Sequence, residues 1–403
     1  MQIIYYFFTK KEINFSFATQ IKNIKPMQSA HFFKIAQSHF NEALPFVLYR
    51  KPNVSIIKGM FQNDATLYRS ENLTESGFVF APFNADGNTI LMPTIHSEIL
   101  ECAVSKDLTP PDCLQDKDFQ NNFHGNFAEA KSIHLNLVSK AIKAIKKGLF
   151  KKVVLSRKEE IMLLNTNPIT LFKRLLSEYK TAFVYCWYHP KIGLWLGASP
   201  ETLLSVTGTR FTTMALAGTQ TFMADKEPIW KAKETTEQQL VTDYLAKNLQ
   251  PLVSNLTIAG VETIKAGNLL HLRTKISGIL KANLIAIVAV LHPTPAVCGL
   301  PKLMAKQFIL ENENYHREFY TGFLGEINRV EFIERNTNRR NVEHSAYNSQ
   351  TTVSNLFVNL RCMQLTDVQA SVYVGGGITI DSIPEQEWEE TVNKTQTIKK
   401  VLF

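Results

Sequence analysis

The stretch LWLGASPETLLSVTGTRFTTMALAGT, residues 194–219, carries the clearest signal of the fold. It is typical of successive β-strands, interrupted first near Pro200 and then at Gly208. Similar apolar runs stand at 151–158 (KKVVLSRK), 182–190 (AFVYCWYHP) and 370–378 (ASVYVGGGI). Short turns rich in Gly and Asn predict antiparallel pairing, and amphipathic helical segments such as 129–148 lie between some of the runs. We therefore expect an α+β fold with large antiparallel β-sheets packed with helices.

Length and composition narrow the class of protein. The 403 residues are 45% hydrophobic, which is enough to bury a large core. The formal charge of +8 is modest and the basic residues are scattered, so we expect no nucleic-acid partner. The longest apolar run, residues 284–291, is too short to span a bilayer, so we expect no membrane partner. Five cysteines without a CxxC pair indicate reduced thiols and hence a cytoplasmic protein.

The pattern along the chain divides it into three parts. Residues 1–26 lack the features of a signal peptide and precede a second methionine, Met27, so we expect an N-terminal extension. Residues 27–128 mix strands with loops rich in Asn, Asp and Pro and are expected to form the N-terminal part of the fold. Residues 129–403 begin with an amphipathic helix and carry the remaining motifs.

A helical segment at 233–245 (KETTEQQLVTDYL) places glutamates on an apolar stripe. Glu234 and Glu237 share this stripe with Val241, because residues three and four apart lie on one helical face. Charged side chains on an inward stripe are costly unless they are paired or bind a metal.

The segment PEQEWEETVNK, residues 384–394, repeats this arrangement. Glu387, Glu390 and Lys394 lie on one stripe, whereas Glu385 and Glu389 point the other way and fit a solvated helix start. Two helices that each supply a Glu-x-x-Glu pair could form an all-oxygen site for Mg²⁺, provided that the helices meet. The alternative is a pair of ordinary surface helices.

Candidate anion-binding groups also stand out. The glycines of GGGI (375–378) leave backbone N–H groups free for close approach of a carboxylate. Arg361 lies on a strand-like run, where a guanidinium is costly unless it grips an acid. An edge-strand arginine that faces water explains the same pattern.

Two further residues are candidates for proton transfer. Strand alternation places Lys152 on one face with Val154, and Lys151 on the other. A lysine held on an inner face can act as a general base. Glu201 follows Pro200 at a strand break, and it could be a general acid or a plain turn carboxylate.

Nine motifs occur in the order found in the chorismate-utilising enzymes. They are KVVLSR (152–157), LGASPETLL (196–204), ALAGT (215–219), EQQLV (237–241), HLRT (271–274), LHPTPAVCGLP (291–301), VNLRC (358–362), GGGIT (375–379) and PEQEWEETVNK (384–394). Over residues 130–400 the chain therefore resembles this family. Its members include isochorismate synthase, salicylate synthase and the large subunits of anthranilate and aminodeoxychorismate synthases. Residues 129–403 are thus expected to form a chorismate-binding catalytic region.

The resemblance implies a role for each matched residue. It implies Mg²⁺ ligands at Glu237 and Glu390, with Glu234 and Glu387 as supporting partners. It implies catalysis by Lys152 and Glu201. It also implies a set of substrate-binding residues: Gly218, Thr219, His271, Arg361, Gly375, Gly377 and Lys394. In the family, Lys394 and the glycine backbone match positions near the ring carboxylate of chorismate, and Arg361 matches the position at the pyruvyl carboxylate.

The residue before VVLSR points to the reaction. Family members that use water resemble this chain in having lysine there, whereas those that use ammonia lack it, so Lys152 implies attack by water. We expect an isochorismate synthase in which Lys152 activates the water and Glu201 protonates the departing hydroxyl. Salicylate synthase is the alternative, and a synthase that works with an amidotransferase partner is a further one. We expect chorismate as the partner, no obligatory amidotransferase, a monomer, and a product used for menaquinone or for siderophores.

One segment departs from the family pattern. Residues 329–355 are longer than the usual hairpin and polar, which predicts a solvated excursion or a basic rim to the site. Nearby, Glu313 and Arg317 are spaced as a helical ion pair, for which we expect a structural role.

Overall fold

The computed structural model describes residues 27–84, 88–104, 127–163, 166–223, 227–266, 269–333 and 349–402. The expected extension, residues 1–26, and the centre of the polar excursion, residues 334–348, lie outside the described residues. So does Cys113. The other four cysteines are buried free thiols, as the sequence predicts.

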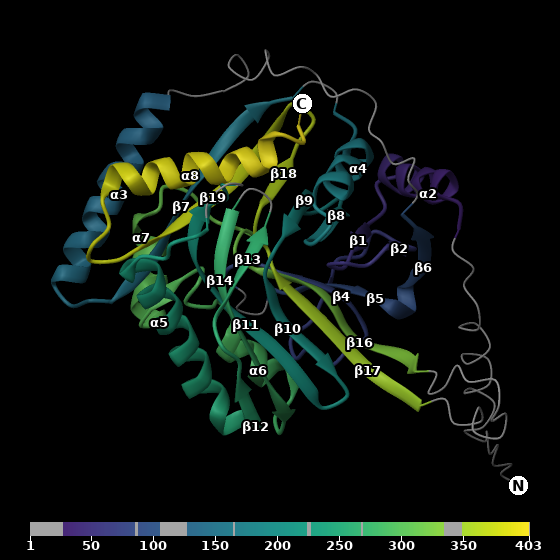
Figure 1. Ribbon diagram of the computed structural model, residues 1–403. Coiled ribbons are helices and arrows are strands. Elements are labelled where there is room, and N and C mark those ends of the chain that lie inside the picture. The colour runs from purple at the N-terminus through teal and green to yellow at the C-terminus, as the bar shows by residue number, and fades with distance from the viewer. Residues whose placement is uncertain are drawn as a thin grey trace, which may run out of the picture.

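Two large antiparallel sheets form the centre of the molecule (Figure 1). The first has the order β15 (Gly299–Leu300), β7 (Lys152–Met162), β19 (Gln369–Ile378), β18 (Cys362–Leu365), β9 (Gly193–Ser199), β8 (Phe183–His189), β1 (Phe46–Arg50), β2 (Ile56–Gln62) and β6 (Ser97–Ala103). The second has the order β12 (Val253–Ile258), β14 (Leu269–Leu280), β11 (Arg210–Thr221), β10 (Thr202–Thr207), β17 (Ser349–Val358), β16 (Phe323–Ile333), β4 (Gly77–Ala81), β5 (Ile90–Pro93) and β3 (Tyr68–Arg69), with β13 (Glu262–Ala266) paired to β14. Strands from before residue 105 therefore extend both sheets.

Helices cover the outer faces of the two sheets (Figure 1). They are α2 (Ser29–Asn41), α3 (Phe127–Lys146), α4 (Pro168–Glu178), α5 (Ala232–Leu249), α6 (Leu284–Leu291), α7 (Lys302–Asn312) and α8 (Pro384–Lys399), with short 3₁₀ turns at Thr94–His96 and Gln250–Leu252. Local chemistry fixes several of their ends. Asn167 caps α4 by accepting the N–H groups of Ile169 and Thr170, and Pro168 occupies the first helical position.

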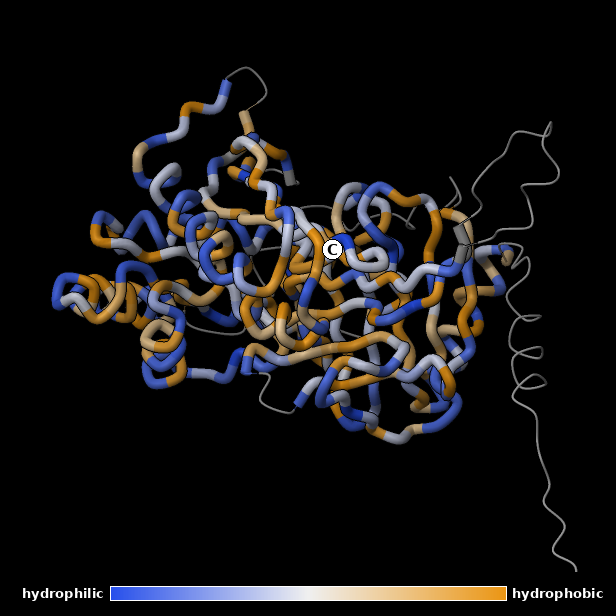
Figure 2. The backbone as a smooth tube through the Cα atoms, turned by 90° about the horizontal axis from the view of Figure 1, so that it is seen from below, coloured by the Kyte–Doolittle hydropathy of each residue, from blue (hydrophilic) through white to orange (hydrophobic). Residues whose placement is uncertain are grey.

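The core lies in layers between and outside the sheets. An aromatic cluster that includes Phe80, Phe183 and Trp195 fills the space between them. Separate clusters lie under α2 and α4, under α5 and α6, and under α3 and α7. Hydrophobic residues accordingly run through the interior, with hydrophilic segments towards the periphery (Figure 2). Among the described residues, none of the helices combines the length and the apolar character that crossing a bilayer requires.

The expected α+β class with large antiparallel sheets is confirmed, and the strand break at Pro200 is where β9 ends and β10 begins. Two local expectations are wrong. Arg361 lies in the connection between β17 and β18, with a positive φ of 49°, because the chain crosses there from one sheet to the other. Glu313 and Arg317 do form an ion pair of 2.5 Å, but it is not helical, because α7 ends at Asn312 and Glu313 is extended.

Candidate active site

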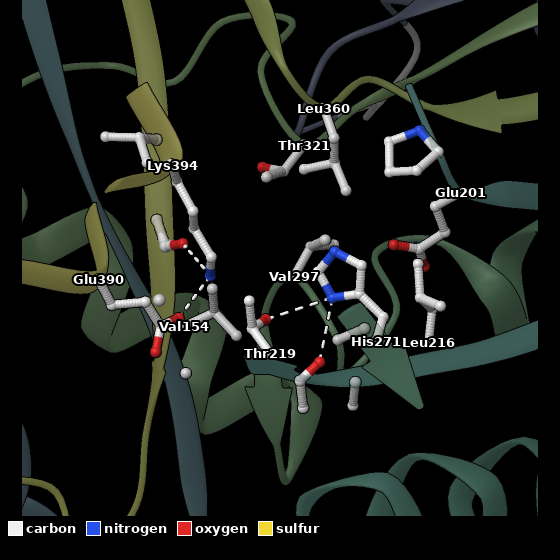
Figure 3. A pocket seen from close by; sticks show the side chains of 18 of the residues that line it. Val154, Glu201, Leu216, Thr219, His271, Val297, Thr321, Leu360, Glu390 and Lys394 are labelled. Carbon is white, nitrogen blue, oxygen red and sulfur yellow. Dashed lines mark hydrogen bonds and ion pairs between the residues drawn. The ribbon is translucent and has the colours of Figure 1, made fainter. Parts of the chain in front are cut away.

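A cavity of about 110 Å³ opens between the two sheets and is closed by α5 and α8. Its wall includes nearly all of the residues that the sequence singles out: Glu201, Gly218, Thr219, Glu234, Glu237, His271, Arg361, Gly375, Gly377, Glu390 and Lys394. Lys152 and Glu387 lie directly behind this wall, paired with wall residues. Figure 3 shows Glu201 at one end of the pocket, Glu390 with Lys394 at the other, and Thr219 and His271 between them.

The two acidic helices do converge, and the place where they meet is the glycine triplet of β19. A side chain at Gly376 would lie 3.4 Å from Glu390 Oε1 and 3.8 Å from Glu387 Oε2. A side chain at Gly377 would collide with Glu237, from α5. Because successive residues of a strand point to opposite faces, the glutamates of the two helices reach β19 from opposite sides.

Buried polar contacts fix the position of α5. Gln238 donates to the carbonyl oxygen of Ala215 at 3.1 Å and to Thr274 Oγ1 at 3.0 Å, which ties the helix to β11 and β14. At the start of the helix, Glu234 Oε2 accepts the N–H of Lys231 at 3.0 Å, so one glutamate of the predicted pair caps the helix.

A second set of contacts fixes α8. Arg157 Nε donates to Thr391 Oγ1 at 2.8 Å, and its guanidinium lies 4.5 Å from the ring centre of Trp388. Both partners stand within four residues of Glu387 and Glu390, so Arg157 holds the turn that carries them. Glu385 and Glu389 are exposed, as expected for a solvated helix start, and Glu389 lies 3.9 Å from Lys131 of α3.

Three glutamates of the cluster each have a lysine partner. Lys152 Nζ lies 2.7 Å from Glu237 Oε1, and Lys394 Nζ lies 2.5 Å from Glu390 Oε1. The third glutamate, Glu387, has its Oε1 2.6 Å from Nζ of Lys233 in α5. Lys394 also donates to the carbonyl oxygen of Gly375 at 3.0 Å.

These pairs set the charge states of the carboxylates. Burial raises the pKa of Glu237, but the charges of Lys152, Lys233 and Lys394 outweigh burial, and the net pKa is lowered. Burial also raises the pKa of Glu387, and there the charge of Lys233 only partly offsets it. The cluster is therefore a set of carboxylates held close together by cations.

Glu201 has the opposite character. It is 3% exposed, and burial raises its pKa to about 8, against the opposing charge of Lys152. At neutral pH it holds a proton and can donate it into the cavity. Lys152 itself is completely buried on the inner face of β7, the same face from which Val154 lines the cavity. Lys151 is exposed, as strand alternation predicts.

His271 supplies a neutral acceptor. Burial and the charge of Arg361 lower its pKa to about 3. Its Nδ1 lies 3.0 Å from the carbonyl oxygen of Gly218, so Nδ1 carries the hydrogen and donates it. Nε2 is then an acceptor; it is buried without a partner and points into the pocket (Figure 3). Gly218 makes this contact at a β-bulge, with a positive φ of 70°.

Several wall residues were missed by the sequence interpretation. Tyr320, Thr321 and Tyr373 line the cavity together with Arg361, which donates to the carbonyl oxygen of Lys394 at 3.5 Å. Tyr320 belongs to YTGFLGEI, where the sequence shows only a turn. No periodic pattern could have found it, because it reaches the cavity from a loop.

Comparison with known proteins identifies the family. A family model described as chorismate binding enzyme matches residues 98–334, and a second with the same description matches residues 345–400. The chain belongs to the chorismate binding enzymes. Among its relatives, isochorismate synthase MenF of Pasteurella multocida is 33% identical over 282 residues, which span 66% of this chain and 60% of the relative's own length.

Solved structures share the fold. DhbC of Bacillus anthracis overlaps 89% of this chain and 96% of its own, with a TM-score of 0.70 and 22% identity. MenF of Escherichia coli, the menaquinone-specific isochorismate synthase, overlaps 89% of both chains with a TM-score of 0.70 and 21% identity. At these identities the likeness concerns the architecture alone.

Proposed function

We propose that the protein is an isochorismate synthase, an isomerase that converts chorismate to isochorismate with Mg²⁺. Water adds at ring C2 while the hydroxyl leaves C4, so one water enters and one is released. The observation that carries the proposal is the pair of proton-transfer groups at one cavity: Lys152, buried on the inner face of β7, and Glu201, which keeps its proton because it is buried.

Lys152 is the proposed base that takes a proton from the attacking water. An amine can do so only when it is neutral, and Lys152 Nζ lies 2.7 Å from Glu237 Oε1. Glu237 is also a proposed metal ligand. A carboxylate that binds a metal cation attracts a neighbouring ammonium group less strongly. Lysine at this position is the feature that favours water over ammonia.

Glu201 is the proposed acid. As the C4 hydroxyl departs, it takes the Glu201 proton and leaves as water. A carboxylic acid that is still protonated near neutral pH suits this step, because proton transfer is most effective when the pKa of the donor is close to the working pH.

The carboxylate cluster fits a hard divalent cation. In the part of the chain that the structure describes, no group of three or more His, Cys, Asp or Glu side chains is arranged to hold a metal by itself. Mg²⁺ commonly takes only one or two protein carboxylates, and waters and substrate oxygens complete its coordination. Glu237 and Glu390 can supply these two carboxylates, with Glu234 beside them. When bound there, the ion would neutralise and orient the substrate carboxylate.

The remaining wall residues suit a dicarboxylate. Lys394 and the backbone of the glycines stand at the metal end, and Arg361 adds a second cation to the wall, so the two carboxylates of chorismate can have different partners. The unpartnered Nε2 of His271 can accept a hydrogen bond from a ring hydroxyl. The product would feed menaquinone or siderophore biosynthesis.

The test is incubation of the purified protein with chorismate and Mg²⁺, followed by chromatography of the products. Isochorismate as the product supports the proposal. Salicylate with pyruvate would identify a salicylate synthase, and anthranilate or aminodeoxychorismate formed with ammonia would place the protein with the amidotransferase-partnered synthases.

A further inference from the structure

One cation of the carboxylate cluster has no part in the proposed reaction. Lys152 and Lys394 are accounted for as base and substrate ligand, but Lys233 is not. It stands in the first turn of α5, lines the cavity, and its Nζ lies 2.6 Å from Glu387 Oε1. Lys233 is 30% exposed at its side chain while Glu387 is 2% exposed, so the lysine reaches inward from the rim.

The position of this ion pair relates it to the metal ligands. Glu387 Oε2 and Glu390 Oε1 approach the same point above Gly376, at 3.8 and 3.4 Å. The Lys233 charge also acts on Glu237 and Glu390, as well as on Glu387. A fixed positive charge therefore lies within a few ångströms of the place where a divalent cation would bind between the two helices.

The charges of the site balance without any ligand. Glu234, Glu237, Glu387 and Glu390 bring four negative charges when ionised, and Lys152, Lys233, Lys394 and Arg361 bring four positive charges. A divalent cation alone would leave the site with a positive excess, and a dicarboxylate alone with a negative one. The two together restore the balance.

We propose that Lys233 lowers the affinity of the Glu237–Glu390 site for a free divalent cation, so that the metal is held tightly only together with a dianionic substrate. This inference rests on the metal ligands of the proposed function. Lys233 is thus an affinity-setting residue and not a catalytic one, because it acts on the metal site through its charge.

The test is a metal titration without substrate. MgCl₂ is titrated into the full-length protein by calorimetry, and Mn²⁺ binding is followed by electron paramagnetic resonance. Lys233→Met should bind either metal about tenfold more tightly than the unaltered protein, the effect of one unit charge on a nearby divalent ion under solvent-like screening. Lys131→Met is the matched control. Lys131 lies on α3, next to exposed Glu389 of α8, so this variant removes the same charge at a different place and should change the metal affinity little.

A third variant tests whether the charge of Lys233 or the shape of its side chain sets the metal affinity. Lys233→Arg keeps the charge and should keep the weak affinity. If Lys233→Met binds metal with unchanged or lower affinity, or if Lys131→Met tightens binding equally, the inference is overturned. If neither the unaltered protein nor Lys233→Met binds metal, it is overturned as well. These titrations contain no chorismate, so a failure to make isochorismate would count against the proposed function and leave this result standing.

Discussion

Replacing Glu201 by glutamine separates the catalytic role of this residue from the energetic consequence of burying it. Glutamine has nearly the size and polarity of a protonated glutamic acid, but it neither titrates nor donates an acidic proton. The variant should therefore fold as the unaltered protein does at mildly acidic pH. Its turnover should fall by roughly 10² to 10⁴, the usual contribution of a general acid.

The magnitude of the stability effect follows from the pKa. Burial raises the pKa of Glu201 from its ordinary 4.5 to about 8. Between these values the folded protein binds a proton that the unfolded chain has lost, so this group makes the protein less stable as pH rises through that window. The shift of about 3.5 units at about 1.4 kcal/mol per unit sets an upper limit of about 5 kcal/mol.

The assay is the free energy of unfolding of both proteins in denaturant, measured from pH 5 to pH 9. Groups other than Glu201 titrate alike in both proteins, so their contributions cancel in the difference. The glutamine variant should gain stability relative to the unaltered protein as pH rises, and the gain should level off above about pH 8. In parallel, kcat of the unaltered protein should decline above about pH 8, and the residual activity of the variant should lose that decline.

Two results would refute this reasoning. A difference in stability that stays constant across the pH range would show that Glu201 titrates normally. Full activity at pH 9 or above would show that no acid with this pKa is needed. Glu389→Gln, at an exposed position of α8, is the control and should leave both profiles unchanged.

Other substitutions test the remaining parts of the site. Glu390→Ala should abolish turnover at millimolar Mg²⁺ and leave the protein folded, whereas Glu389→Ala should be nearly silent; equal damage from both, in a steady-state assay, would contradict the assignment of helical faces. Lys152→Gln should lower kcat by roughly 10²-fold or more with little change in chorismate binding, and Lys151→Gln is its control; near-normal isochorismate formation by the first variant would remove Lys152 as the base. Gly377→Ala should weaken Mg²⁺ binding in a calorimetric titration, because its methyl group would displace the carboxylate behind it; unchanged affinity would show that the carboxylate is free to move.

Much of the architecture could be predicted because it is local. Period-two alternation identified β7 and the side of it that Lys152 faces, and period 3.6 separated Glu390 from Glu389. The strand break at Pro200 was also correct. In each case the prediction depended only on neighbours along the chain.

Expectations failed where the tertiary structure decides the conformation. Arg361 looked like a strand residue because both of its flanks are strands, but the two strands belong to different sheets and the crossing needs a positive φ. Glu313 and Arg317 have helical spacing, yet their ion pair closes a loop that also holds β7, since Glu313 accepts the N–H of Ser156 at 2.8 Å. Lys233 was overlooked because its partner Glu387 stands 154 positions further along the chain.

The glycine triplet joins the two halves of the site in a way that the sequence alone did not suggest. The sequence interpretation gave these glycines one purpose, backbone approach to a substrate carboxylate. In the structure, Gly376 makes room for glutamates of α8 on one face of β19, and Gly377 makes room for Glu237 and Lys152 on the other. A strand normally separates its two faces by its side chains, but here only backbone lies between them. Carboxylates from the two helices therefore come close to the same stretch of β19, which is the arrangement that the proposed metal site depends on.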